Sequence, residues 1–454
     1  MTSPALISVA APALFAIGTS RFRDRRLVPP SSQFTPALAT MNVRPLSTVA
    51  SLLVLNLAMA AQARPLPTPQ QLEALRQQGP AGLEQFLRQY GVKPDRPPAA
   101  DLRASLDQLC QQRDCYASQL YWHTDLEQAK AAAKASGKPI LSLRLLGGLD
   151  QDLSCANSRF FRVALYPNAA VSQYLRDRFI LYWSSERPVP KVTIDFGDGR
   201  KLERTVTGNS IHYVLNADGQ PIDAIPGLYG PQAFLKQLQQ AEQAAQRYDR
   251  TPGEQQAEFL RNYHRDRLAA LQAQWAADLT QLGIRNRPRL LELSGSLPPT
   301  DAATAGQIAL TKMAVERPLV NAALSAATQN QAMLSDITDS DSWRKIATRY
   351  ATEARLDRNS LTLMQRKLTP QSANSLDTVA RQFETLMALD TVRNEYLLHS
   401  QIHQWFMQGR AIADWQTLNQ RVYAELFLTP IADPWLGLLP QEGFAAIENN
   451  GLIP

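Results

Sequence analysis

Cysteine is scarce in this chain, with only three among 454 residues. This number excludes a disulfide-rich secreted scaffold, because such domains are short and contain several cysteine pairs. Charged residues make up 19% of the sequence and apolar residues 44%, a balance typical of globular rather than disordered chains. The length allows two or three domains with sizeable cores.

A large excess of charge of one sign is also missing. Lys and Arg number 47 and Asp and Glu 41, which gives a formal net charge of +6. Five of the basic residues and one acidic residue lie in residues 1–63, so the rest of the chain carries only +2. Without a basic patch, we expect no nucleic-acid partner. The sequence also lacks a P-loop, a Gly-rich dinucleotide turn and a serine-nucleophile elbow, and we expect no cofactor.

The apolar run near the N-terminus is too short for a stable membrane span. It lies in residues 41–63, MNVRPLSTVASLLVLNLAMAAQA, which combine a basic start, an apolar middle and a small-x-small end. These are the three parts of a signal peptide. We therefore predict cleavage before Arg64 and an exported protein, periplasmic or extracellular. Residues 1–40 are then a doubtful upstream extension; in the alternative, Met1 is the true start and residues 5–18 are the targeting segment.

Export changes the interpretation of the three cysteines. Cys110 and Cys115 in LCQQRDC are close enough for a local disulfide in an oxidising compartment, or they are two ordinary thiols on a helix. A disulfide across so short a loop would stabilise the fold only modestly. Cys155 is the odd cysteine, and an unpaired thiol outside the cytosol calls for an explanation.

Predicted helices and strands divide the remaining chain into three parts. Residues 64–119 contain short helical patterns. Residues 120–241 alternate helices with strands, with a hairpin inserted at 191–206, where an Asp-Gly turn joins two alternating runs. Residues 250–454 carry apolar residues at helical spacing over long segments. The sequence therefore predicts an α/β domain with a mixed sheet flanked by helices, followed by a mainly α-helical C-terminal domain.

Several local sequences in residues 120–241 follow a recognisable order. They are an opening tryptophan, an alanine-rich helix ending in GKP before a strand, a cysteine that begins a helix, a further helix and strand, and a last strand: Trp122, EQAKAAAKASGKPILSLRLL, CANSRFF, NAAVSQYLRDRFILYW and YVLNADGQPI. In this order, residues 120–241 resemble exported thioredoxin-like proteins. The resemblance covers roughly a quarter of the chain, close to the size of a small domain. It implies a thioredoxin fold with Cys155 at the redox-active position.

The sequence departs from the pattern of that family at several points. Ser158 stands in place of the second cysteine, so the motif is Cys-x-x-Ser, and Leu153-Ser154 replaces the aromatic residue before the first cysteine. The family's cis-proline loop, which faces the active cysteine and binds substrate backbone, falls near residues 209–211, Asn-Ser-Ile, without a proline. The inserted hairpin occupies a place where the family usually has a helix.

Cys155 can act only as a lone thiol. The free amides and dipole of a helix N-terminus favour its thiolate, while Asp150 and Asp152 oppose it. Such a thiolate can attack a partner's disulfide and form a mixed disulfide with release of a thiolate, but Ser158 cannot resolve it. The expected partner is therefore a protein that presents a thiol or a disulfide. Monothiol exchange at Cys155 and Ser158 is therefore one candidate redox function. The alternative is a noncatalytic thioredoxin-like scaffold or interaction module, in which Cys155 serves packing and the helical domain binds a partner.

Two features of the C-terminal half have weaker signals. His399 and His403 lie four residues apart, the spacing of a two-histidine metal pair, and Glu395 lies one turn earlier. Because no HExxH motif or nearby cysteine completes a ligand set, we predict no metal site. The apolar segment DPWLGLLP, residues 433–440, is either a loop packed across the helices or a docking surface.

Overall fold

The structure is a computed structural model, and it describes residues 65–206, 208–284, 340–369, 375–409, 415–437 and 446–452. The predicted signal peptide and the residues before it lie outside these ranges. No helix in the described ranges is both long enough and apolar enough to cross a membrane.

Four short helices at the N-terminal end form a small core of their own. A capping box at Thr68 begins the first of them, and Leu363 from the C-terminal region contributes to their core. Cys110 and Cys115 are joined in a disulfide between the last two helices. These helices are α1 (Pro69–Gln77), α2 (Pro80–Tyr90), α3 (Ala100–Cys110) and α4 (Cys115–Ser118).

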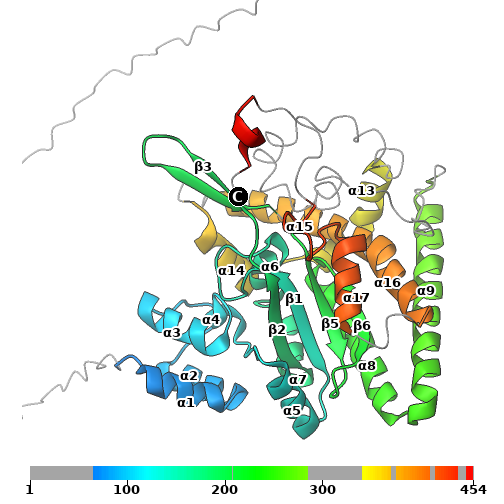
Figure 1. Ribbon diagram of the computed structural model, residues 1–454, viewed down its shortest axis with the longest axis horizontal. Helices are drawn as coiled ribbons and strands as arrows, with labels where there is room; N and C mark the ends of the chain where they lie inside the picture. Colours follow the sequence, from blue (N-terminus) through cyan, green and yellow to red (C-terminus); the bar gives the residue numbers. More distant parts are fainter. Residues whose placement is uncertain are drawn as a thin grey trace, which may run out of the picture. The chain divides into compact units, whose positions relative to one another are not determined.

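A four-stranded mixed sheet follows, in the order β2-β1-β5-β6 (Figure 1). The central strand β1 is parallel to β2 and antiparallel to β5, and all seven of its residues are buried. Its five Ile and Leu residues fit this burial on both faces, and Ser142 and Arg144 are buried among them. The strands are β1 (Ile140–Leu146), β2 (Ile180–Arg187), β5 (Ser210–Leu215) and β6 (Pro221–Pro226).

Helices cover both faces of this sheet, so the predicted mixed sheet flanked by helices is confirmed. The ring of His212 on β5 contacts Phe161 and Phe234, whereas the hydroxyl of the next residue, Tyr213, donates to Asn419 on the opposite face. Successive residues of a strand point to opposite faces. The helices of the α/β part are α5 (Leu126–Ser136), α6 (Ala156–Phe160), the π-helix η1 (Phe161–Leu165), α7 (Ala169–Arg178) and α8 (Pro231–Arg250).

A separate two-stranded hairpin lies between β2 and β5. It consists of β3 (Lys191–Asp195) and β4 (Lys201–Thr205), which pair antiparallel with each other. Gly199 in the connecting turn has a φ of 90°, a conformation that L side chains rarely adopt. Figure 1 shows the hairpin extending away from the four-stranded sheet.

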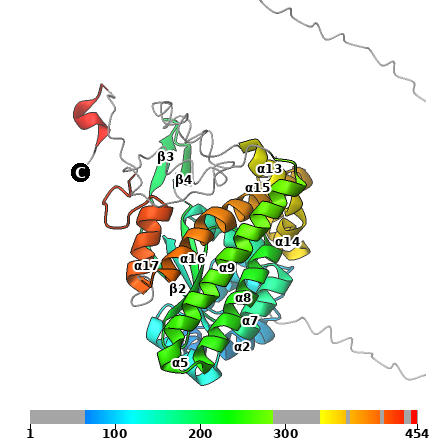
Figure 2. The same ribbon diagram turned by 90° about the vertical axis from the view of Figure 1, so that its right-hand side faces the viewer.

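The described part of the C-terminal region is helical, as predicted. Figure 2 shows α9 and α16 side by side, in agreement with their extensive contacts. The elements are α9 (Gly253–Gln281), α13 (Ser340–Arg349), η3 (Ala351–Ala354), α14 (Arg358–Lys367), α15 (Leu376–Arg393), the π-helix η5 (Asn394–His399), α16 (Ser400–Met407), α17 (Trp415–Arg421), the π-helix η6 (Val422–Leu426) and η7 (Glu448–Gly451).

One hydrophobic core crosses the boundary expected near residue 250. It extends from Leu120 in the α/β part to Leu436 near the C-terminus. Only Thr251 and Pro252 separate α8 from α9. The helices on the two sides of this junction therefore contribute apolar residues to one common core rather than to separate cores.

This shared core predicts the behaviour of a fragment of residues 250–454. The fragment exposes the apolar faces that pack on the sheet, so we expect it to lack a cooperative thermal transition. The measurement is far-ultraviolet circular dichroism during heating, with residues 64–454 as the control, which should melt cooperatively. A cooperative melt of the isolated fragment would show that the helical region has an independent core.

Candidate functional site

Cys155 lies at the N-cap of α6, directly after the loop that leaves β1. Its amide donates to the carbonyl oxygen of Leu146, the last residue of β1, at 3.0 Å. Its side chain is fully buried, and its Sγ lies 2.8 Å from Oγ of Ser210 at the start of β5. The thiol is thus at the beginning of a helix, but it faces the protein interior.

Ser158 does not contact the sulfur through any hydrogen bond in the described structure. Its hydroxyl oxygen lies 2.6 Å from Oγ of Ser154 and 2.9 Å from the carbonyl oxygen of Cys155. The hydroxyl of Ser158 donates to a backbone carbonyl oxygen three residues earlier, which is a local side-chain-to-backbone hydrogen bond within the first turn of α6. The two predicted site residues therefore meet through the backbone of Cys155 and not through its thiol.

The charged side chains near Cys155 mostly interact with groups other than its thiol. The guanidinium of Arg162 is buried and donates to Oγ of Ser154 and to the carbonyl oxygen of Asp152. Burial lowers the pKa of Arg162. Asp152, which the sequence suggested would oppose a thiolate, lies 3.0 Å from Arg113 in an ion pair. Its charge is therefore largely compensated by cations outside the thiol site.

The segment opposite Cys155 is covered by the C-terminal region. The side-chain amide of Asn209 donates to Oγ1 of Thr429 at 2.7 Å. The backbone carbonyl oxygen of Asn209 accepts from the hydroxyl of Tyr423 at 3.3 Å. Tyr423 is fully buried there. No cis peptide bond occurs among the described residues. Residues more than 200 positions further along the chain thus bind the segment where the resemblance places a substrate-binding loop.

A second polar cluster lies between the edge strand β6 and the C-terminal helices. Its centre is Asp223 of β6, whose Oδ1 lies 3.1 Å from Nε2 of His399. Oδ2 of Asp223 accepts from the hydroxyl of Tyr263 on α9 at 2.6 Å. The other ring nitrogen of His399 lies 3.1 Å from the carboxylate of Glu395. His399 therefore bridges two carboxylates inside the protein.

Two further histidines complete this cluster. Nδ1 of His403 lies 2.8 Å from Nδ1 of His264 and 4.0 Å from Oδ1 of Asp223. Nε2 of His264 donates to the carbonyl oxygen of Ile222 at 3.0 Å. All three histidines of the cluster are fully buried, and Asp223 is 2% exposed. The spacing of His399 and His403 was visible in the sequence, but their approach to Asp223 and His264 was not.

The charges of the cluster are set by these contacts. Burial alone would lower the pKa of His399, but the carboxylates of Glu395 and Asp223 outweigh it and raise this pKa to about 9. Burial would raise the pKa of Asp223, whereas His399 holds it well below its ordinary value. Burial lowers the pKa of His264 to about 4. Without a bound ion, the cluster contains a charged His399 between two carboxylates and a neutral His264.

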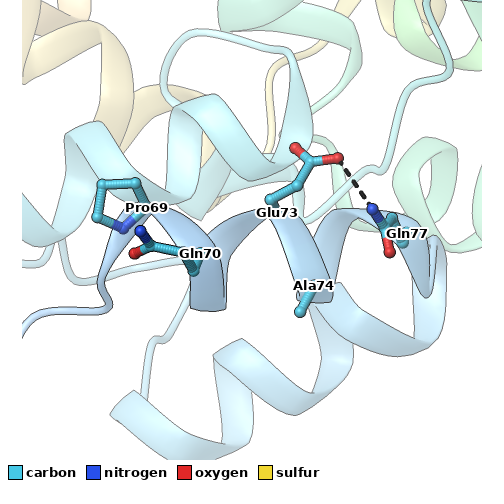
Figure 3. A pocket seen from close by; sticks show the side chains of 5 residues that line it. All are labelled: Pro69, Gln70, Glu73, Ala74 and Gln77. Carbon is cyan, nitrogen blue, oxygen red and sulfur yellow. Dashed lines mark hydrogen bonds between the residues drawn. The ribbon is translucent and has the colours of Figure 1, made fainter.

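The depression in Figure 3 offers no comparable chemistry. Its lining side chains all come from α1, and one hydrogen bond joins Gln77 to Glu73 within it. None of the residues around Cys155 or Asp223 contributes to it. The two buried clusters are therefore the chemically informative sites in the described ranges.

The environment of Cys155 predicts slow alkylation in the folded protein. We expect iodoacetamide to react with it at least about 100-fold more slowly than in denaturant, since an opening that costs about 3 kcal/mol exposes under one percent of molecules. Mass spectrometry of the intact chain measures the rate, and Cys155→Ala supplies the background. Equal rates in the folded and denatured protein would contradict the buried position of the thiol.

Comparisons with known proteins do not indicate a function, so a functional proposal depends on this geometry. No family model matches the chain, and no curated protein or solved structure shows a significant match to it.

Proposed function

We propose that this protein is an exported, noncatalytic thioredoxin-like protein that acts by binding a protein partner. The observation that carries the proposal is the burial of the Cys155 sulfur against Oγ of Ser210. In thiol-disulfide exchange, the attacking sulfur must reach the partner's sulfur directly. A sulfur without exposed surface cannot do so while the fold is closed, so the geometry favours the binding function over monothiol exchange.

The arrangement around β1 supports a thioredoxin-like origin of the sheet. Helix α5 precedes β1, Cys155 begins the next helix, and α7 leads into β2 beside β1. This is the order of elements on which the resemblance of residues 120–241 depends. The differences from the family pattern at Ser158 and at residues 209–211 are then those of a scaffold with the same architecture but without a second thiol or a substrate-binding proline.

The C-terminal region supports the noncatalytic interpretation independently. A substrate that approached Cys155 along residues 209–211 would have to displace Thr429 and Tyr423, which are bonded to Asn209. Such displacement would leave the buried polar groups of Asn209 without partners, at a cost of about 1–3 kcal/mol for each group. The chain's own C-terminal segment thus competes with a substrate for the same backbone.

The hairpin β3–β4 is the surface that we assign to a partner. Val192 and Ile194 point to one face of the hairpin, with Leu202 paired to Ile194 across the strands. Phe196 continues this alternation at the turn and is 57% exposed, and Val192 is 38% exposed. These four residues form an apolar stripe on a projecting element, which is the kind of surface that partner proteins bind.

Trp435 adds a second exposed aromatic residue near the base of this hairpin. Arg187, the last residue of β2, donates to the carbonyl oxygens of Asp433 and Pro434 at 2.7 and 3.0 Å. These bonds hold the loop that carries Trp435, which is 44% exposed, beside the strand that leads into β3. Within the described residues 433–437, the exposed Trp435 fits a docking surface and the buried Leu436 fits a loop packed on the core.

The cysteine pairing supports an exported location. A disulfide between Cys110 and Cys115 persists in oxidising compartments and is rare in the cytosol. The predicted signal peptide of residues 41–63 would deliver the chain to such a compartment.

Processing provides a direct test of export. The mature protein should begin near Arg64 and be recovered outside the cytoplasm, because signal peptidase cleaves after the small-x-small sequence of residues 61–63. N-terminal sequencing of protein from the periplasm and culture medium measures this. A mature chain that still contains the RFRDRR sequence of residues 21–26 would refute the proposed start.

Photo-crosslinking tests the partner surface. With a photoreactive phenylalanine analogue at Phe196, we expect a discrete adduct with another protein in the source organism, since the apolar stripe is buried on binding. The same analogue at Leu66, which is 48% exposed, is the matched control and should give no such adduct. Unlabelled wild-type protein should suppress the adduct, whereas a Phe196→Ser, Val192→Ser competitor should not.

The Cys155→Ala variant separates binding from thiol chemistry in this experiment. Binding through the hairpin predicts the same adduct yield with and without the thiol. An adduct that requires Cys155, or equal adducts at Phe196 and Leu66, would overturn the proposed function.

A further inference from the structure

We propose that Asp223, His264, His399 and His403 form a closed binding site for one divalent transition metal ion, with zinc as the best fit. One donor atom from each of Asp223, His399 and His403 lies within 4.8 Å of the other two. The donors come from β6 and from consecutive turns of η5 and α16. This site is independent of the proposed partner surface and of Cys155.

The separations of the donor atoms suit a small tetrahedral ion. Metal–ligand distances of about 2.0–2.1 Å place tetrahedral ligands about 3.3 Å apart. The observed separations are 3.1 Å from Asp223 Oδ1 to His399 Nε2 and 4.0 Å from the same oxygen to His403 Nδ1. They lie on either side of the required value, so small side-chain movements suffice.

The outer contacts already hold the ligands in the orientation that coordination requires. Nδ1 of His399 can donate to the carboxylate of Glu395 while Nε2 faces Asp223. A carboxylate behind a histidine is the usual arrangement around metal-binding imidazoles. Glu395 is in turn fixed by the hydroxyl of Tyr229 at 3.0 Å, and Tyr263 fixes the second oxygen of Asp223.

His264 is the proposed fourth ligand, because its Nε2 is used by the carbonyl oxygen of Ile222 and its Nδ1 can bind the ion. The carbonyl oxygen of Ile222 only accepts hydrogen bonds, so Nε2 of His264 carries the proton and Nδ1 presents a lone pair. In the empty site, His403 must then donate through Nδ1, which leaves its buried Nε2 without a partner among the described residues. A metal ion at Nδ1 of His403 replaces that proton, and the lone pair of His264 faces the same cation.

The donor set and its burial define the kind of metal centre. Three imidazoles and one carboxylate favour zinc and related first-row ions over magnesium or calcium, which prefer all-oxygen sites. The histidines are fully buried, and His264 would complete the tetrahedron begun by Asp223, His399 and His403. Zinc sites without an open position stabilise structure rather than catalyse reactions. The ion would therefore join β6 to α9 and α16.

Metal analysis of the purified mature chain tests this proposal. The protein of residues 64–454, produced without a histidine tag and incubated with zinc, should retain about one zinc ion per chain after gel filtration, measured by plasma mass spectrometry. His403→Gln should lower the retained zinc at least about fivefold, because it removes a ligand. His123→Gln is the matched control, since His123 is buried but lies outside the cluster, and it should retain the ion.

Cobalt keeps the test decisive if His403→Gln does not fold. Chelator-treated wild-type protein that is loaded with Co²⁺ should show the intense visible absorption of tetrahedral cobalt, and its Tm should rise on loading. Retention of less than about 0.2 zinc ions per chain together with an unchanged Tm would overturn the proposal. Equal zinc content in wild type and a folded His403→Gln variant would also overturn it.

Discussion

The buried carboxylate of Asp223 constrains the whole arrangement of the C-terminal helices. It lies on an edge strand, and transfer of a carboxylate out of water is costly unless charge and hydrogen bonds compensate it. Compensation comes from Tyr263 on α9 and from His399 on η5, so both elements must be in place when β6 is buried. Removal of one partner from such a buried ion pair costs about 3–5 kcal/mol. The sheet and the helices are therefore coupled by charge as well as by a common core.

This coupling extends to the environment of Cys155. The helices anchored at Asp223 lead along the chain to α17 and η6, whose residue Tyr423 bonds Asn209 beside the start of β5. The C-terminal region thus covers Asn209, next to the Ser210 that contacts the thiol, as a consequence of packing on the sheet. In physical terms, the cysteine is protected by the remainder of the chain and not by its local sequence.

That dependence on distant residues explains what the sequence could predict. The buried strand Ile140–Leu146, the hairpin turn at Gly199 and the helical spacing of the C-terminal region are local patterns, and each corresponds to an element of the structure. The burial of Cys155 depends on Ser210, 55 positions away, and on the C-terminal segment that bonds the neighbouring Asn209, and no local pattern encodes these contacts. The cluster around Asp223 was only half visible, because the spacing of His399 and His403 is local whereas Asp223 and His264 meet them through folding.

The hairpin differs from the four-stranded sheet because its apolar side chains are not used to build the core. The four-stranded sheet is covered on both faces, so its side chains are committed to packing. The strands β3 and β4 pair only with each other within the described residues, and their outer edges carry unpaired backbone groups. Exposed edges of this kind promote self-association unless charged residues interrupt them. Lys191 and Lys201 provide such charges on the face opposite Phe196 and Val192. The hairpin therefore carries the apolar stripe, with Arg204 beside Val192, on one face, while the charges on its other face oppose indiscriminate strand pairing.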